Sequence, residues 1–108
     1  VILDAAMNDL MRPALYGTKH RIIPSIKNKK TINKIFEFVG PICENTDFFA
    51  KNRAMPKVEE GDILAIEVAG AYGFVMASSY NGVLKPAEVL VNNNHHQLIR
   101  QREEIWKL

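Results

Sequence analysis

Cysteine is almost absent from this chain, since Cys43 is its only one. A single thiol cannot form a disulfide within the chain. This is typical of proteins in a reducing cytosol, so we expect a cytoplasmic location. No second cysteine is available as a metal ligand, and His95 and His96 lack the spacing that zinc sites use. The sequence therefore predicts no metal centre.

Long apolar runs are missing as well. The longest one, residues 63–71, is interrupted by Glu67 and Gly70, whereas a helix that crosses a bilayer needs about 20 apolar residues. The composition, with 47% hydrophobic and 24% charged residues, is typical of one soluble globular domain. We expect no membrane partner.

Neither sign of charge dominates the sequence. The 14 basic residues are nearly balanced by 12 acidic ones, which gives a net charge of +2. Four lysines do cluster, and such a run can attract phosphates; they are Lys27, Lys29, Lys30 and Lys34. We expect a solvated turn between two strands there and no nucleic-acid partner.

Short apolar segments separated by turn signals predict a mainly β, barrel-like domain with little helix. We expect strands at residues 1–4, 20–26, 33–39, 63–68, 87–91 and 95–102. The first is expected to be buried, and the third to be buried on much of both faces. Pro24 restricts the second to an edge or bulged strand. Residues 51–57 are predicted to form a polar loop.

Short helical turns are expected between some of these strands. In the first, Asn8 or Asp9 caps the turn, Pro13 limits it and Gly17 ends it. Two more are expected at residues 74–79 and 103–108.

Arg12 and Tyr16 are four positions apart, so they share one face of a helical turn. The planar guanidinium of Arg12 suits a carboxylate, and Tyr16 adds a hydroxyl donor. The two residues are therefore candidates for binding an acidic substrate. The alternative, which the sequence leaves open, is that Arg12 pairs with Asp4 or Asp9 while Tyr16 lies in the core.

Cys43 is followed directly by Glu44 in a loop that a Gly-Pro turn introduces. A neighbouring carboxylate favours the protonated thiol, which suits a proton donor better than a nucleophile. Glu44 suits the ammonium group of a substrate. The alternatives are a structural cysteine and an exposed Glu44 that pairs with a lysine such as Lys51.

Tyr72 lies between Gly70 and Gly73, where the backbone can come close to a ligand. Its hydroxyl can donate to a phosphate, although a core tyrosine at a strand end is an equal alternative. The segment has neither the GxGxxG pattern nor a P-loop lysine, so it is not a nucleotide motif.

Taken together, these segments resemble the carboxy-terminal part of diaminopimelate decarboxylase, a pyridoxal-phosphate enzyme of bacterial lysine synthesis. The resemblance covers nearly the whole chain and is carried by residues 1–5, 12–17, 40–44, 60–62, 70–73 and 85–91. The Arg-Pro-Ala-Leu-Tyr and Cys-Glu segments are together quite specific to this family. Departures are modest: Ala6 stands where the family usually has glycine, and Asn45 where it usually has serine.

The resemblance implies a role for each candidate residue. Arg12 and Tyr16 bind substrate, with Arg12 holding a carboxylate. Glu44 recognises the distal, non-reacting end of diaminopimelate. Tyr72 contacts both the cofactor and the substrate, and Cys43 is the proposed proton donor.

The resemblance also implies pyridoxal phosphate as cofactor, meso-diaminopimelate as substrate, and a head-to-tail homodimer. In this dimer, the loop of Cys43 and Glu44 enters the partner's active site. The cofactor-binding lysine of the family lies in an amino-terminal barrel, which is missing here. Residues 1–108 are therefore expected to be the C-terminal β-barrel or Greek-key-like domain of a longer enzyme, inactive alone, with residues 1–17 bordering the barrel.

The apolar opening of the chain at Val1, without an initiator methionine, favours the same interpretation. The alternative function is a non-catalytic β-domain that mainly mediates dimerisation.

Overall fold

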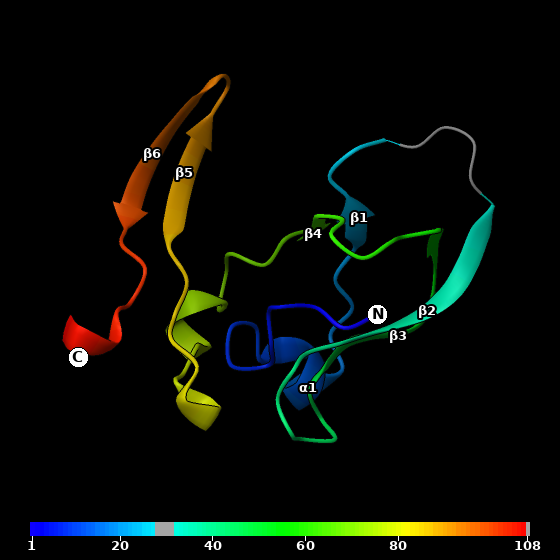
Figure 1. The fold of residues 1–108 in the computed structure, drawn as a ribbon, viewed down its shortest axis with the longest axis horizontal. Helices are drawn as coiled ribbons and strands as arrows, with labels where there is room; N and C mark the ends of the chain where they lie inside the picture. The colour runs from blue at the N-terminus through cyan, green and yellow to red at the C-terminus, as the bar shows by residue number, and fades with distance from the viewer. Residues whose placement is uncertain (28–31, 108) are drawn as a thin grey trace.

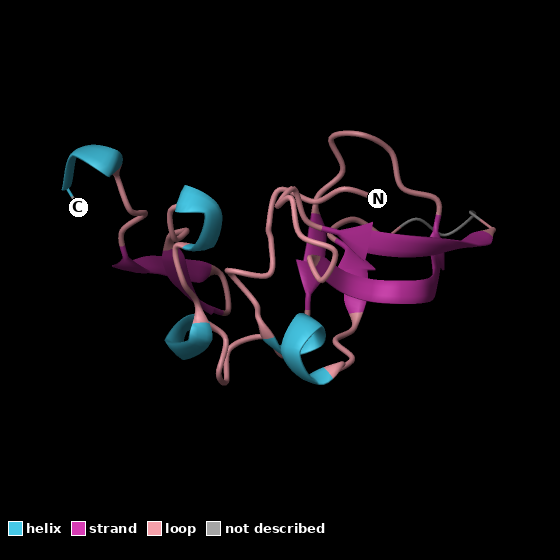
Figure 2. Cartoon of the chain, turned by 90° about the horizontal axis from the view of Figure 1, so that it is seen from below, coloured by secondary structure: helices cyan, strands magenta, loops and turns pink. Residues whose placement is uncertain are grey.

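The computed structural model describes residues 1–27 and 32–107. Its strands pair antiparallel in three separate two-stranded sheets (Figures 1 and 2). β1 (Ile22–Pro24) pairs with β4 (Leu64–Ile66), β2 (Asn33–Val39) with β3 (Phe48–Pro56), and β5 (Glu88–Asn92) with β6 (His95–Arg100). The helical elements are short: α1 (Arg12–Tyr16), η1 (Phe74–Met76), η2 (Tyr80–Gly82) and η3 (Ile105–Lys107).

The mainly β class predicted from the sequence is confirmed, but the described residues do not form a closed barrel. The hairpin of β5 and β6 lies at one end of the molecule, and the other two sheets lie at the opposite end (Figure 1). Each sheet has only two strands, so no strand closes one sheet onto the next. The apolar hairpin residues Val89, Leu90, Val91, Leu98 and Ile99 are correspondingly exposed.

The core lies in the β1–β4 part of the chain. It is built from apolar side chains of the first helical region and three strands: Leu10, Ile22, Phe38, Phe49, Ala50 and Met55. Burying a side chain such as Phe38, which is fully buried, stabilises the fold by about 1.5–3 kcal/mol. The loop that carries Cys43 and Glu44 joins β2 to β3, and both strands contribute side chains to this core.

β2 has the bounds that the sequence predicts, but its expected burial on both faces is wrong. Phe38 is the one fully buried side chain of this strand, whereas Ile35 is 66% exposed. Residues 1–4 are also less buried than the sequence predicts. Ile2 forms a single parallel bridge with Val39 and is 76% exposed, so the predicted buried first strand is wrong as well.

The polar loop predicted at residues 51–57 is also wrong, because β3 continues through it. Between the pairs Phe36–Arg53 and Phe38–Ala50, β3 contains one residue more than β2. Asn52 takes up part of this bulge with a left-handed φ of 50°. The bulge shifts which side chains face the core, so the simple alternation typical of a strand is lost.

α1 ends at Gly17 as predicted, with a left-handed φ of 66°. Its start differs from the prediction. The N-cap residue is Met11 with no side-chain cap, and Pro13 lies in the first turn, where its missing N–H costs nothing. Asp9 instead accepts a hydrogen bond from Ala6 N at 3.1 Å.

The later elements follow the sequence closely. The turn at Asn93, with a φ of 53°, joins β5 to β6, and the expected helical turns are present as η1 and η3. The lysine-rich turn, including Lys29 and Lys30, lies outside the described residues. Within residues 1–27 and 32–107, no helix has the length and apolar character needed to cross a membrane.

Candidate functional site

Asp47 fixes the loop that presents Cys43 and Glu44. Its buried carboxylate accepts hydrogen bonds from Met7 N to Oδ1 at 2.7 Å and from Ile42 N to Oδ2 at 2.8 Å. The carboxylate packs so closely against Gly40 that a side chain there would collide with it. The loop is thereby held to the body at both sides, while Cys43 and Glu44 face outward.

The Glu44 carboxylate accepts two hydroxyl hydrogen bonds. Tyr80 Oη donates to Oε2 at 2.9 Å, and Thr46 Oγ1 donates to Oε1 at 3.2 Å. The expected alternative partner, Lys51, lies elsewhere, with its Nζ 4.4 Å from the centre of the Phe48 ring. Glu44 is thus exposed and oriented by hydroxyl groups, and no described lysine or arginine forms an ion pair with it.

Tyr80 was missed by sequence reasoning because it lies 36 positions from Glu44. The one local signal is the turn that follows it, where Asn81 and Gly82 have left-handed φ angles of 60° and 71°. The hydrogen bond to Glu44 raises the pKa of the Tyr80 hydroxyl above its ordinary value, since it stabilises the protonated phenol. The carboxylate charge adds to this effect.

Asn8 ties the Tyr80 turn to the same segment that holds Asp47. Asn8 is fully buried; its Nδ2 donates to Ser78 O at 3.1 Å, and Ser78 N donates to Asn8 O at 3.0 Å. Tyr80 N in turn donates to Ser78 Oγ at 3.3 Å. Met7 and Asn8 therefore position both the Glu44 loop and its hydroxyl partner.

Arg12 and Tyr72 form a second group. The Arg12 guanidinium carbon lies 5.9 Å from the centre of the Tyr72 ring, within the range of a cation–π contact. Tyr72 has a φ of 59° and is 65% exposed. Gly73 permits this tight turn because a side chain there would collide with the Ala69 carbonyl.

The structure decides some of the alternatives that the sequence leaves open. Tyr16 and Tyr72 are 66% and 65% exposed, so neither is a core tyrosine. Cys43 is exposed rather than buried. Within residues 1–27 and 32–107, Arg12 forms no ion pair with Asp4 or Asp9.

The two groups remain separate within one chain. Among the described residues, no hydrogen bond, ion pair or cation–π contact joins Arg12 or Tyr72 to Cys43 or Glu44. The chain therefore presents a cationic, aromatic group and an acidic, thiol-bearing group.

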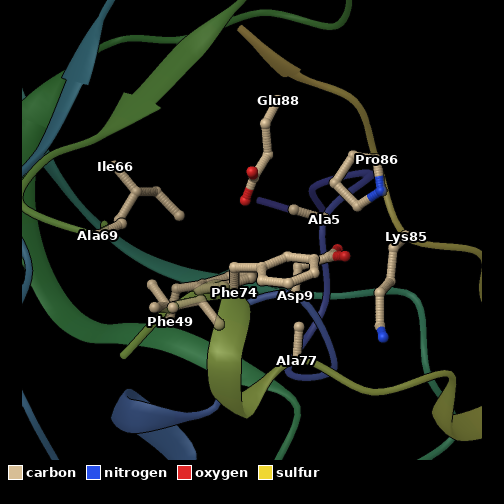
Figure 3. A pocket seen from close by; sticks show the side chains of 12 residues that line it. Ala5, Asp9, Phe49, Ile66, Ala69, Phe74, Ala77, Lys85, Pro86 and Glu88 are labelled. Atoms are coloured by element: carbon tan, nitrogen blue, oxygen red, sulfur yellow. The ribbon is translucent and has the colours of Figure 1, made fainter. Parts of the chain in front are cut away.

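A cavity of about 210 Å³ lies between the core and the segment that leads into β5 (Figure 3). Its wall is mainly apolar, and its polar rim consists of Asp9, Lys85 and Glu88. None of the five candidate residues lines it. Partial burial raises the pKa of Asp9, and the charges of Asp4 and Asp47 add to this, although the hydrogen bond from Ala6 N opposes it.

Across residues 1–27 and 32–107, no three or more His, Cys, Asp or Glu side chains are grouped so that they could hold a metal ion.

Comparison with known proteins decides the family. The family model for the C-terminal sheet domain of pyridoxal-dependent decarboxylases matches residues 1–70. The chain belongs to this family. Diaminopimelate decarboxylase of Archaeoglobus fulgidus is 48% identical over 108 residues, which is 100% of this chain and 26% of that protein.

Solved structures agree with this decarboxylase domain along almost its whole length. A crystal structure from Aquifex aeolicus superposes with a TM-score of 0.91 and 48% identity, covering 96% of this chain and 26% of the other. Diaminopimelate decarboxylase from Helicobacter pylori, complexed with L-lysine, has a TM-score of 0.90 and 41% identity, covering 99% and 26%. The chain thus spans about a quarter of the length of the relatives that it matches.

Proposed function

We propose that this chain is the C-terminal part of a diaminopimelate decarboxylase, which uses pyridoxal phosphate to release carbon dioxide from meso-diaminopimelate and form L-lysine. The observation that carries the proposal is the match of the whole chain, at 48% identity, to an enzyme of that name. The exposed positions of Cys43, Glu44 and Tyr72 and the half-buried position of Arg12 are consistent with it.

The residues present fit one edge of a site for pyridoxal phosphate. Tyr72 projects from a left-handed turn with its ring exposed, and the Arg12 guanidinium lies beside it. A phenol hydroxyl and a guanidinium are suitable donors to phosphate or carboxylate oxygens. Tyr72 would contact the cofactor, and the cofactor-binding lysine would come from the barrel outside this chain. When bound, pyridoxal phosphate accepts the electrons left behind as carbon dioxide departs.

The remaining tasks belong to the protein's own side chains. Arg12 and Tyr16 hold a substrate carboxylate, which fixes the orientation of the amino acid. Glu44 binds the ammonium group at the distal end, which holds the non-reacting end of the substrate in place. Cys43 Sγ delivers the proton that replaces the departed carboxylate.

A shared site in a homodimer accounts for the separation of the two groups. Arg12 and Tyr72 would serve one site, while the outward-facing loop with Cys43 and Glu44 reaches the site of the partner. Each chain then contributes to two sites. This arrangement requires the complete protein, and we expect the 108-residue chain to be inactive alone.

The test uses the complete protein encoded by the reading frame that contains this chain. With added pyridoxal phosphate and meso-diaminopimelate, we expect equal amounts of carbon dioxide and L-lysine. Glu44→Gln should lower kcat/KM by about tenfold or more, because a hydrogen bond to a charged group is lost. Glu60→Gln, which removes an exposed carboxylate from another loop, is the matched control and should leave kcat/KM nearly unchanged.

Absence of lysine formation by the unaltered complete protein would overturn the proposal. If Glu44→Gln and Glu60→Gln change kcat/KM equally, the assigned role of Glu44 is wrong, whereas the proposed overall reaction is unaffected. Turnover by the 108-residue chain alone would contradict the assignment of the cofactor-binding lysine to a barrel outside this chain.

A further inference from the structure

Among residues 1–27 and 32–107, Tyr80 is the one side chain outside the Glu44 loop that forms a hydrogen bond with a candidate site residue. Its hydroxyl donates to Glu44 Oε2 at 2.9 Å across 36 sequence positions. Neither side chain is buried, so this contact alone contributes little to stability. Its effect is on the direction in which the Glu44 carboxylate points.

The backbone on both sides of this hydrogen bond is fixed by one segment. Met7 N donates to Asp47 and so holds the Glu44 loop. Asn8, the next residue, exchanges two hydrogen bonds with Ser78 and so holds the turn that precedes Tyr80. The backbone positions of Tyr80 and Glu44 relative to each other are therefore fixed by the buried residues Asn8 and Asp47.

We propose that Tyr80 is a positioning residue that holds the Glu44 carboxylate in place for the distal ammonium group of the substrate. The inference rests on the proposed function, in which Glu44 binds that group. Tyr80 itself touches no reacting atom in this assignment, and it acts through Glu44.

The hydrogen-bond capacity of the carboxylate supports this assignment. An ionised carboxylate has about four acceptor sites on its two oxygens. Tyr80 occupies one on Oε2, and Thr46 occupies one on Oε1. The remaining acceptor sites on the two oxygens can bind the N–H groups of an ammonium ion, because an ionised carboxylate only accepts hydrogen bonds and an ammonium ion only donates them.

The hydroxyl groups of Tyr80 and Thr46 orient the Glu44 carboxylate before the substrate binds. A free glutamate side chain loses rotamer freedom when it binds a cation, and this loss weakens binding. Glu44 is already restricted by contacts on both oxygens, so less freedom remains to be lost. Removal of the Tyr80 hydroxyl should therefore weaken binding at the distal end and leave the later proton transfer nearly unchanged.

The test is a double-mutant cycle in the complete protein that contains this chain, with the variants Tyr80→Phe, Glu44→Gln and both together. Tyr80→Phe removes a single oxygen atom from an exposed ring. We expect KM for meso-diaminopimelate to rise about tenfold with kcat changed less than twofold, as for a lost hydrogen bond to a charged group. In the Glu44→Gln background, the same substitution should change KM less than twofold.

Binding of L-lysine, measured by titration calorimetry, provides a readout that is independent of turnover. Its affinity should fall by a similar factor in Tyr80→Phe, because lysine retains the ammonium group of the non-reacting end. Ser79→Ala removes the neighbouring exposed hydroxyl without a contact to Glu44, and it should leave both KM and lysine affinity unchanged.

The outcomes separate the two proposals. If the unaltered complete protein forms no lysine, the proposed function fails and the role of Tyr80 fails with it. If the protein is active and Tyr80→Phe changes neither KM nor lysine affinity, only the role of Tyr80 is overturned. An effect of Tyr80→Phe that is equally large with Glu44→Gln also overturns it, because Tyr80 then does not act through Glu44.

Discussion

The Asp47 carboxylate accepts hydrogen bonds from Ile42 in its own loop and from Met7, which lies 40 positions earlier. Through these two contacts, a residue that faces the interior determines where Cys43 and Glu44 stand on the surface. Asn8 does the same for the turn before Tyr80. At the scale of single residues, the candidate site is therefore fixed by buried polar groups that take no part in the proposed chemistry.

Asp9 is a residue whose charge should oppose folding. Partial burial raises its pKa above the ordinary value of 3.8, so the folded protein holds its proton to higher pH than the unfolded chain does. The resulting contribution to stability is fully present below pH 3.8 and is lost as the pH rises through the folded pKa. Ionised Asp9 is thus a cost at neutral pH.

Asp9→Asn should remove this cost while keeping an oxygen that can accept from Ala6 N. We expect the midpoint of urea unfolding to rise at pH 7 and to stay unchanged near pH 3, where Asp9 is already neutral. Glu60→Gln changes an exposed carboxylate in another loop and serves as the control. A stabilisation by Asp9→Asn that is equal at both pH values would contradict a charge effect.

At the scale of elements, the sequence predicts what is encoded locally and misses what depends on distant partners. The bounds of β2, the hairpin turn at Asn93 and the end of α1 at Gly17 follow from alternation and from residues that favour left-handed backbone. The second part of β3 was predicted as a loop at residues 51–57, because the bulge interrupts the alternation of inward- and outward-facing side chains between Ala50 and Arg53.

The Asn52 bulge makes a specific prediction for β3. Asn tolerates its φ of 50°, whereas a β-branched side chain in the left-handed region is strained by about 1–2 kcal/mol. Asn52→Val should lower the free energy of unfolding by about that amount, and Asn52→Gly should have a small effect. Ala54→Val, at an exposed position of the same strand, is the control. Chemical denaturation of all three variants checks this, and equal effects of the two valine substitutions would rule out backbone strain.

At the scale of the whole molecule, the contacts that build the candidate site are the ones that sequence reasoning could not supply. Asn8 and Ser78 lie 70 positions apart, and Tyr80 and Glu44 lie 36 positions apart. No periodicity or spacing links such pairs, because the path of the chain brings them together. The family resemblance names candidate residues such as Cys43 and Glu44, whereas the buried residues that support them, Asn8 and Asp47, are identified only from the folded chain.

The hairpin of β5 and β6 should govern how the 108-residue chain behaves when it is produced alone. It carries apolar side chains that are about half exposed or more, including Val91 at 69% and Ile99 at 57%. Its sheet also has only two strands, which leaves both outer edges unpaired. Exposed apolar residues on unpaired strands favour association between copies. We therefore expect light scattering to show association that increases with concentration.

Replacing Leu90, Val91 and Ile99 by threonine retains β-propensity and removes much of this apolar surface. The triple variant should remain monomeric at concentrations where the unaltered chain associates. Threonine at the exposed polar positions His96 and Gln97 controls for the change of strand sequence and should leave association unchanged. If the triple variant associates as strongly as the unaltered chain, the hairpin is not the surface involved. The apolar surface at the other end of the molecule, around Ile35 and Ile63, would then account for association.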